Sequence, residues 1–334
     1  MYRSILVPLD GTYFGEHALP PALAIARRTG AKLHLVHVHV PEGSWSALGA
    51  LPQWGASLRD VVVQREQGYL REVMERISRL AGVPVDAQVL DGPIARTLAE
   101  QAMEADVDLV ALSTHARTGV SRLWHHGVAA YLTRHLSVPL LMVHAPDRPA
   151  EIEREAGFGR VLLPLGGKAY NERVLDHAVE LGRVFGARYT LLEVVAPPVE
   201  MGYTLLGSEG HVNEFQLESR REEALRYLDG VADKLRQRGL EVDADVVASG
   251  DAATGIVEYV ERAEGGVDLV AMETHGLGGA AHLFTPSVVE SVVHDTRVPV
   301  LVHHTAEAPR APEEEPAAEP EMGWSPHHRD PIAP

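Results

Sequence analysis

The chain repeats itself once at long range, and this repeat constrains its fold more than any other feature. A strand-like run ending in Pro8-Leu9 recurs as one ending in Pro164-Leu165, and residues 108–115 recur nearly unchanged as residues 268–275, so the copies lie 156 to 160 residues apart. Solenoid repeats are much shorter, with periods of roughly 20–50 residues. The 334 residues leave room for two domains, since typical domains have about 100–200 residues. We therefore expect two domains of the same fold.

Each copy alternates short apolar runs with longer segments of helical periodicity. The expected strands are apolar on both faces, which is typical of a parallel sheet covered by helices on both sides. In the first copy they are Ser4 to Leu9, Lys32 to Val40, Pro84 to Leu90, Val107 to Thr114 and Pro139 to His144. This order predicts an α/β fold: two Rossmann-like, doubly wound domains, each with a five-stranded parallel sheet flanked by helices.

Proline content and polarity mark the boundaries between these parts. We expect a first domain over residues 1–145, a linker over 146–158, a second domain over 159–304 and an acidic, Pro-rich tail over 305–334. The tail has too few apolar residues to form a core, so we expect it to be disordered.

Charge and composition exclude several classes of function. The formal net charge is −17 and no Lys/Arg cluster interrupts the acidity, whereas nucleic-acid binding needs a surface that neutralises phosphates. The absence of cysteine excludes disulfides, thiol catalysis and Cys-ligated metal, and fits a reducing compartment. No apolar run approaches the length of a membrane span. We expect a cytoplasmic protein with neither a nucleic-acid nor a membrane partner.

The expected ligand site lies beyond the carboxyl ends of the strands, where open parallel sheets bind their ligands. Segments that arrive there in the first copy are Asp10-Gly11-Thr12, Val38 to Pro41, Asp91-Gly92-Pro93 and Ser113 to Gly119. A helix starting near Gly127 would direct its N-terminal N–H groups towards an anion.

Several motifs in both copies are similar to those of universal stress proteins, over about residues 2–144 and 160–304. In the first copy they include the first strand ending in Val-Pro-Leu-Asp, the second ending in His-Val, and the Thr-His-Ala loop followed by Val-Pro-Leu-Leu-Met-Val. The second copy has Leu-Pro-Leu, a Thr-His-Gly loop and Val-Pro-Val-Leu-Val in the same order. The resemblance implies a Rossmann-like five-stranded sheet, dimerisation through the last strand and a role in stress survival. Members of that family divide into those that bind ATP and those that do not.

The loop after the fourth strand departs from the ATP-binding pattern, which reads Gly-x-x-Gly, nine residues, Gly-Ser/Thr. The first copy has Ser113-Thr114-His115-Ala116, nine residues, His126-Gly127; the second has Glu273-Thr274-His275-Gly276, nine residues, Pro286-Ser287. On the base side, the first copy keeps Asp10 and Val38, which the resemblance places near ribose and adenine. In the first copy, Arg117 or a protonated His126 can replace lost hydrogen-bond donors with charge.

The nucleotide site is therefore expected in the first domain and only weakly in the second. The candidate residues are Asp10, Val38, Gly92, Ser113, His115, Ala116, Arg117, His126 and Gly127 in the first domain, and Gly166, Val194, Gly276 and Ser287 in the second. The expected cofactor is ATP with Mg²⁺ in the first domain.

Catalytic and metal sites are not expected. His37 and His39 share one strand face, but the chain has no cysteine and no His-x-x-x-His pair. We therefore expect these histidines to be hydrogen-bonded within the fold or exposed at the surface rather than to bind a metal. His115 and His275 recur at the same loop position, where ordering the loop is favoured over proton transfer because no partner group can be named.

Apolar loops follow the second strand of each copy and are interpreted as lids, a docking surface or plain packing. Their residues are Trp45, Leu48, Leu51 and Trp54 in the first copy, and Met201, Tyr203, Leu205 and Leu206 in the second.

Three functions remain open on the sequence. The first is a non-enzymatic stress-response module that binds adenine nucleotide, the second a protein-interaction module without nucleotide, and the third a slow ATPase. The expected partners are the chain itself, as an intramolecular pseudo-dimer through Pro139 to His144 and Pro299 to His304 or as a homodimer, and an unidentified regulatory protein. Pairing the last strands removes an exposed edge from each sheet.

Overall fold

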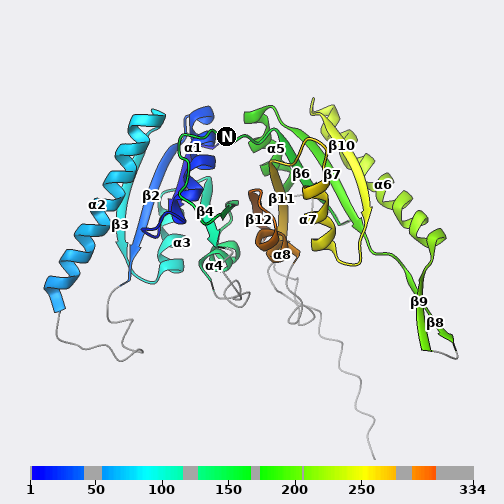
Figure 1. Cartoon of the computed structure of the whole chain (residues 1–334). Helices are drawn as coiled ribbons and strands as arrows, with labels where there is room; N and C mark the ends of the chain where they lie inside the picture. The colour runs from blue at the N-terminus through cyan, green and yellow to red at the C-terminus, as the bar shows by residue number, and fades with distance from the viewer. Residues whose placement is uncertain are drawn as a thin grey trace, which may run out of the picture.

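The computed structural model describes residues 2–40, 55–115, 127–166, 174–204, 207–275 and 288–305. Figure 1 shows the two copies side by side, the first in blue to green and the second in green to orange. The elements of the first copy are β1 (Ser4–Pro8), η1 (Gly15–Ala18), α1 (Leu19–Thr29), β2 (Lys32–His39), α2 (Gly55–Ala81), β3 (Val85–Asp91), α3 (Ile94–Glu104), β4 (Leu109–His115), α4 (Val128–His135) and β5 (Leu140–Ala145).

The second copy repeats this order with one addition, a hairpin after its second strand. Its elements are β6 (Arg160–Pro164), α5 (Val174–Phe185), β7 (Arg188–Val195), β8 (Val199–Thr204), β9 (Gly207–Val212), α6 (Glu214–Gln237), β10 (Val242–Ala248), α7 (Ala252–Arg262), β11 (Leu269–His275), α8 (Val288–Asp295) and β12 (Val300–Thr305).

The strands of both copies join in one ten-stranded sheet, in the order β10-β7-β6-β11-β12-β5-β4-β1-β2-β3. Within this sheet, all neighbouring strands of the same copy are parallel. The sequence therefore predicted the fold class correctly, as two doubly wound five-stranded domains. The strands of the first copy differ from the expected ranges by one or two residues at their ends, which is the usual uncertainty of such boundaries.

The seam between the domains is the antiparallel pairing of β5 with β12. Leu141 lies opposite Leu301, and the flanking pairs are Met142 with Val300 and Leu140 with Val302. This confirms the predicted contact between the last strands. Because β5 and β12 cover each other, the free edges of the sheet are those of β3 and β10.

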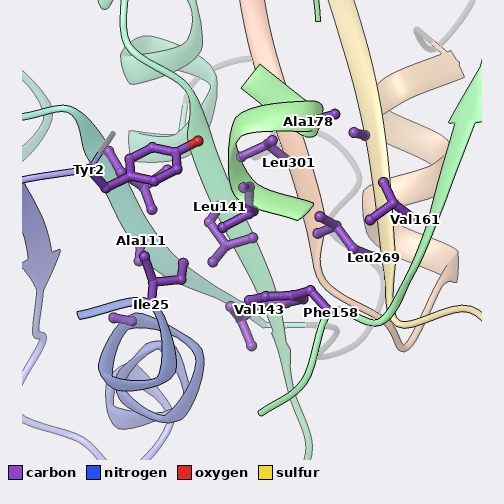
Figure 2. Packing of buried hydrophobic residues seen from close by; sticks show 14 of the residues in the cluster. Tyr2, Ile25, Ala111, Leu141, Val143, Phe158, Val161, Ala178, Leu269 and Leu301 are labelled. Carbon is purple, nitrogen blue, oxygen red and sulfur yellow. The ribbon is translucent and has the colours of Figure 1, made fainter. Parts of the chain in front are cut away.

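Two hydrophobic layers cover the sheet and run through both domains. One layer contains residues of α1, α2, α5 and α6, and the other contains residues of α3, α4, α7 and α8. Figure 2 shows the first layer at the seam, where Ile25, Leu141, Ala178 and Leu301 lie in one cluster. Side chains of both domains thus share one core across the seam.

The segment between the domains is packed against this core. Ile152 and Phe158 are buried, and the Phe158 ring meets the Phe185 ring edge-on at 5.0 Å between centroids. The Arg28 guanidinium lies 4.6 Å from the centroid of the Phe185 ring, a cation–π contact between α1 and the end of α5. The linker is fixed at these points, while its boundaries at 146 and 158 stay a prediction.

The connection after β7 differs from the expected apolar loop. Its residues Met201 and Tyr203 lie in β8, which pairs antiparallel with β9 from Val199 opposite Val212 to Thr204 opposite Gly207. Pairing the two strands satisfies backbone groups that a projecting loop would leave to water. Leu205, Leu206 and the apolar loop of the first copy (Trp45, Leu48, Leu51 and Trp54) lie outside the described residues. So does the tail from residue 306 on, whereas Thr305, its expected first residue, is the last residue of β12.

Gly30 ends α1: its backbone is left-handed, with φ 74°, and its N–H donates to the Ala26 carbonyl at 2.8 Å. Among the helices that the structure describes, none has the length and apolar character of a bilayer span.

We expect Gly182→Ala to destabilise the protein, although alanine normally favours a helix interior over glycine by about 1 kcal/mol. A Cβ at this position in α5 would lie 2.8 Å from Cζ and 2.9 Å from Cε1 of Tyr189, whose ring is buried. Overpacking of a core costs about 1–3 kcal/mol, so the net loss should be about 1 kcal/mol. Urea denaturation checks this, with Gly230→Ala in α6, where a Cβ meets nothing within 4 Å, as a control expected to gain stability.

Candidate functional site

The turn after β1 brings Asp10 to the carboxyl edge of the first domain. Its Oδ1 accepts hydrogen bonds from the Thr12 backbone N–H at 2.9 Å and the Thr12 hydroxyl at 2.7 Å. Gly11 between them has φ 80°, which favours glycine. The side chain of Asp10 remains exposed, so its carboxylate is held in place at the surface where a ligand would bind.

Val38 and Gly92 lie at the neighbouring strand ends. Val38 pairs with Leu90, and its side chain is buried in the layer of α3 and α4, so only its backbone is suited to contact a ligand. The Gly92 N–H donates to the His39 carbonyl at 3.1 Å. Its φ is 146°, and a Cβ would lie 2.5 Å from Thr97 Oγ1, so this position requires glycine.

The start of α4 reaches the same edge, as the sequence predicted. Gly127 is the N-cap residue, and no side chain caps this helix within the described part of the chain. Ser113 is half-buried in β4 opposite Val143, and His115 is the last residue of that strand. Ala116, Arg117 and His126 lie outside the described residues, so their predicted roles are untested.

The second domain differs at the equivalent positions. Gly166 is exposed directly after β6, and Val194 lies in β7. Glu273 stands where the first domain has Ser113, and its Oε2 accepts from the Val174 N–H at 3.1 Å. The first backbone N–H of α5 is therefore already hydrogen-bonded to a carboxylate. Gly276 and Ser287 lie outside the described residues.

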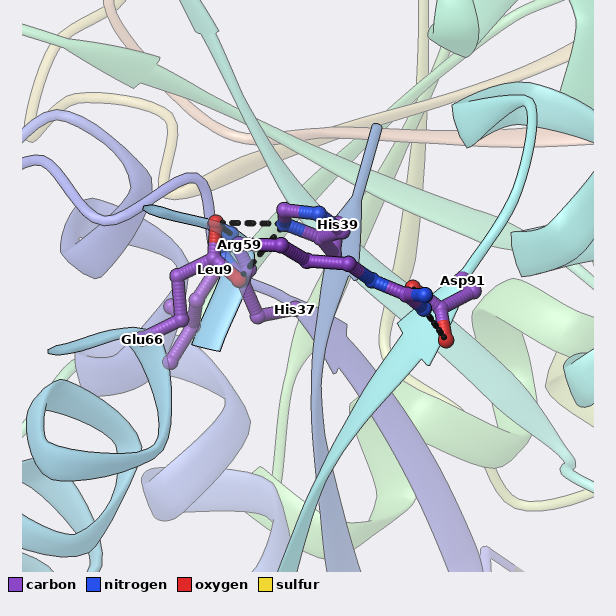
Figure 3. A network of polar contacts seen from close by, with 6 residues as sticks. All are labelled: Leu9, His37, His39, Arg59, Glu66 and Asp91. Atoms are coloured by element: carbon purple, nitrogen blue, oxygen red, sulfur yellow. Dashed lines mark hydrogen bonds and ion pairs between the residues drawn. The ribbon is translucent and has the colours of Figure 1, made fainter. Parts of the chain in front are cut away.

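Two histidines of β2 share one carboxylate, an arrangement that sequence reasoning missed (Figure 3). His39 Nδ1 lies 3.0 and 3.1 Å from the two Glu66 oxygens, and His37 Nε2 lies 3.4 Å from Glu66 Oε1. His37 Nδ1 donates to the Leu9 carbonyl at 2.8 Å, which ties the cluster to the turn that contains Asp10. The shared strand face of the two histidines is confirmed.

A second ion pair joins the start of α2 to the end of β3. Arg59 lies 3.2 Å from Asp91, and both side chains are more than half exposed, so the pair contributes at most about 1 kcal/mol. In the described ranges no group of three His, Asp or Glu side chains is arranged to hold a metal ion. His125 and His126 both lie outside those ranges.

A cleft of about 530 Å³ lies away from the strand ends, between α1 and α5. Its lining residues are Arg28, Asp176, Val179, Glu180, Arg183, Val184 and Arg238. Arg28 pairs with Glu155 at 2.9 Å and Arg238 with Asp176 at 3.2 Å. Folds of this kind bind ligands at the carboxyl ends of the strands, so we locate the candidate site at Asp10 and Gly127. The loops there fall partly outside the described residues. We assign the cleft to packing between the domains.

Comparison with known proteins identifies the family of both domains. The sequence model of the universal stress protein family matches residues 1–144 and 157–304. The chain belongs to the universal stress protein family. Among its relatives, universal stress protein MJ0531 of Methanocaldococcus jannaschii is 25% identical over 159 residues, which are 44% of this chain and 85% of that protein. YxiE of Bacillus subtilis is 26% identical over 149 residues, 43% of this chain and 98% of the relative.

Solved structures match this universal stress protein over nearly its whole length. The crystal structure of a universal stress protein from Archaeoglobus fulgidus covers 91% of this chain and 97% of the other, with a TM-score of 0.65 and 17% identity. A putative universal stress protein from Pseudomonas aeruginosa covers 91% of this chain and 93% of the other, with a TM-score of 0.54 and 17% identity. At this identity the likeness shows a shared tandem fold.

Proposed function

We propose that this universal stress protein is a non-enzymatic binding module of the stress response that holds one adenine nucleotide, ATP with Mg²⁺, in its first domain. The observation that carries the proposal is the difference between the two domains at the carboxyl ends of their strands. The first domain presents a fixed Asp10 carboxylate and an uncapped start of α4, whereas the second has Gly166 and a carboxylate, Glu273, at these strand ends.

The phosphate side of the proposed site is the start of α4. A helix N-terminus carries unpaired N–H groups and a partial positive charge, which favour an anion. No described side chain competes for these groups at Gly127. We propose that Ser113, His115 and Ala116 line the approach to this helix N-terminus. Arg117 and His126 would add positive charge near the phosphates.

The base side of the proposed site is formed by Asp10, Val38 and Gly92. Ribose hydroxyls are donors that a carboxylate accepts, and the hydrogen bonds from Thr12 hold the Asp10 carboxylate in place before the ligand arrives. The backbone of Val38, near the end of the neighbouring strand β2, is the proposed contact for the adenine base. In the second domain Gly166 offers no such acceptor, and the charge of Glu273 opposes a triphosphate, so Val194, Gly276 and Ser287 support at most a weaker site.

A protein-interaction module without nucleotide is the second candidate. The observation that favours it is the β8–β9 hairpin, which forms a sheet of its own next to the start of α6 (Figure 1). Phe215 in the first turn of that helix is 85% exposed, and exposed aromatic residues are enriched at protein interfaces. This candidate would be favoured if wild type does not bind ATP and if Phe215→Ser abolishes the binding of a protein partner.

The first test is to purify the protein gently, denature it and identify any released nucleotide by mass spectrometry. About one adenine nucleotide per chain would support the first candidate. No nucleotide, together with a flat calorimetric titration with ATP and Mg²⁺, would contradict it.

Asp10→Ala is expected to weaken ATP binding about 10- to 150-fold, since hydrogen bonds to charged groups contribute about 1.5–3 kcal/mol. Calorimetric titration measures the change, and Gly166→Ala in the second domain is the matched control that should leave affinity unchanged. Thr12→Ala removes the internal contact but keeps the carboxylate, so a small effect there separates ligand binding from loss of the turn. Equal effects of Asp10→Ala and Gly166→Ala would refute the assignment to the first domain.

A further inference from the structure

The cluster around Glu66 contains a buried nitrogen that the fold itself does not use. His39 is the last residue of β2, and its side chain is only 5% exposed. Its Nδ1 faces both oxygens of Glu66 at 3.0 and 3.1 Å. Its Nε2 is buried and has no hydrogen-bond partner in the part of the chain that the structure describes.

The contact with Glu66 fixes what this nitrogen can do. A carboxylate only accepts hydrogen bonds, so Nδ1 of His39 carries the proton that is donated to Glu66. In the neutral ring, Nε2 then carries a lone pair and acts as an acceptor. A buried acceptor without a donor has a free-energy cost, which a ligand with a suitable N–H or O–H removes.

The position of His39 connects it to the candidate site. Its carbonyl accepts from the Gly92 N–H at 3.1 Å. The neighbouring His37 is bound to the Leu9 carbonyl, and its Cε1 would lie 3.8 Å from a Cβ at Gly11. The cluster therefore lies directly behind the turn of Asp10 and beside Gly92, at the edge of the sheet where the nucleotide is proposed to bind.

We propose that His39 Nε2 accepts a hydrogen bond from the nucleoside part of the ligand in the first domain, with Glu66 as the positioning residue that fixes the ring. This inference rests on the proposed nucleotide-binding function. A nucleoside offers two kinds of donor, the amino group of adenine and the ribose hydroxyls, whereas an ionised phosphate offers none. The contact would therefore discriminate between nucleosides rather than add general affinity for anions.

The second domain lacks this arrangement. Pro8 pairs with Val36 in the first domain and Pro164 with Leu192 in the second, so the position equivalent to His39 is Val195. A valine has no acceptor. His39 thus adds to the difference that Asp10 and Gly166 establish between the domains, and it does so from a different strand.

The test combines variants of the full chain with nucleotide analogues in calorimetric titrations. ATP, 2′-deoxy-ATP, 3′-deoxy-ATP and inosine triphosphate are titrated into wild type and His39→Leu. We expect His39→Leu to weaken ATP binding about 2–10-fold, the range for one neutral hydrogen bond. The analogue that lacks the contacted donor should bind wild type more weakly than ATP does, by the same factor. It should bind the His39→Leu variant with the same affinity as ATP does. His34→Leu, at the other end of β2, is the control and should bind ATP like wild type.

The outcomes separate the two proposals. A wild type that neither carries nor binds nucleotide overturns the proposed function and this inference with it. If wild type binds ATP and His39→Leu binds it with the same affinity, the His39 contact alone is overturned. The same holds if the variant discriminates between the four nucleotides to the same extent as wild type does. If circular dichroism shows that His39→Leu does not fold, His39→Phe keeps a ring in the same volume and is held to the same expectations.

Discussion

Replacing Leu301 by aspartate should lower the free energy of unfolding by more than ~4 kcal/mol, because the change places an unpaired charge in the core. Leu301 lies opposite Leu141 in the seam between β12 and β5, and both side chains are fully buried. Hydrophobic residues of both domains surround them (Figure 2). A charge at this point would be surrounded mainly by apolar side chains.

Urea denaturation followed by circular dichroism measures this loss. Met103→Asp, at a position on α3 that is 62% exposed, is the matched control and should change stability by less than about 0.5 kcal/mol. Because the core is continuous across the seam, Leu141→Asp in the first domain should cause a similar loss. If either seam variant unfolds only its own domain and leaves the other at wild-type stability, the shared core is not a cooperative unit.

Acidification from pH 6.5 to 4 should destabilise the protein through histidines near the seam. Burial and the neighbouring His303 lower the pKa of His177 to about 4, while Asp176 opposes this shift; the two rings lie 4.3 Å apart. Burial, followed by Arg297, His294 and His17, also lowers the pKa of His144 in β5.

The direction of the effect follows from proton binding. Above pH 6.5 these rings are neutral in both states. As the pH falls from 6.5 towards 4, the unfolded chain binds protons that the native protein does not, so stability is lost over this window. A shift from 6.5 to 4 corresponds to ~3 kcal/mol at most, and because His177 is only half-buried we expect about 1–2 kcal/mol after solvent screening.

The measurement is the free energy of unfolding at pH 7 and pH 4.5 for wild type and His177→Gln. Carboxylates titrate in both proteins, so the difference between the two pH profiles isolates the histidine. We expect the variant to lose less stability than wild type on acidification. Parallel profiles would show that His177 does not contribute to the acid sensitivity.

Most of the fold was predictable because it depends on local patterns. Runs that are apolar on both faces gave the strands of the parallel sheet, and the repeat gave the second domain. The pairing of Pro139 to His144 with Pro299 to His304 followed from the exposed edge that each sheet would otherwise have. The hairpin of β8 and β9 was not predicted, because its stability comes from pairing across a turn rather than from a long apolar run.

The candidate site was predictable only where one residue follows directly from a strand end. Asp10 lies at the expected edge for this reason, and Gly127 lies there because a helix that connects two parallel strands begins at their carboxyl end. Glu66 was missed because it lies 27 residues from His39, and only the packing of α2 on the sheet brings them together. The sequence indicated the charge of Glu273 but not its contact, since the N–H of Val174 that it binds lies 99 residues away.

The antiparallel seam has a consequence for the composition of the assembly. Two separate chains that pair through their last strands form a symmetric dimer, whose two sites are identical and whose population depends on dilution. Here one backbone carries both partners, so their local concentration is fixed by the tether. Every molecule therefore contains one domain with Asp10 and His39 and one with Gly166 and Glu273, in a ratio that neither expression level nor dilution can change.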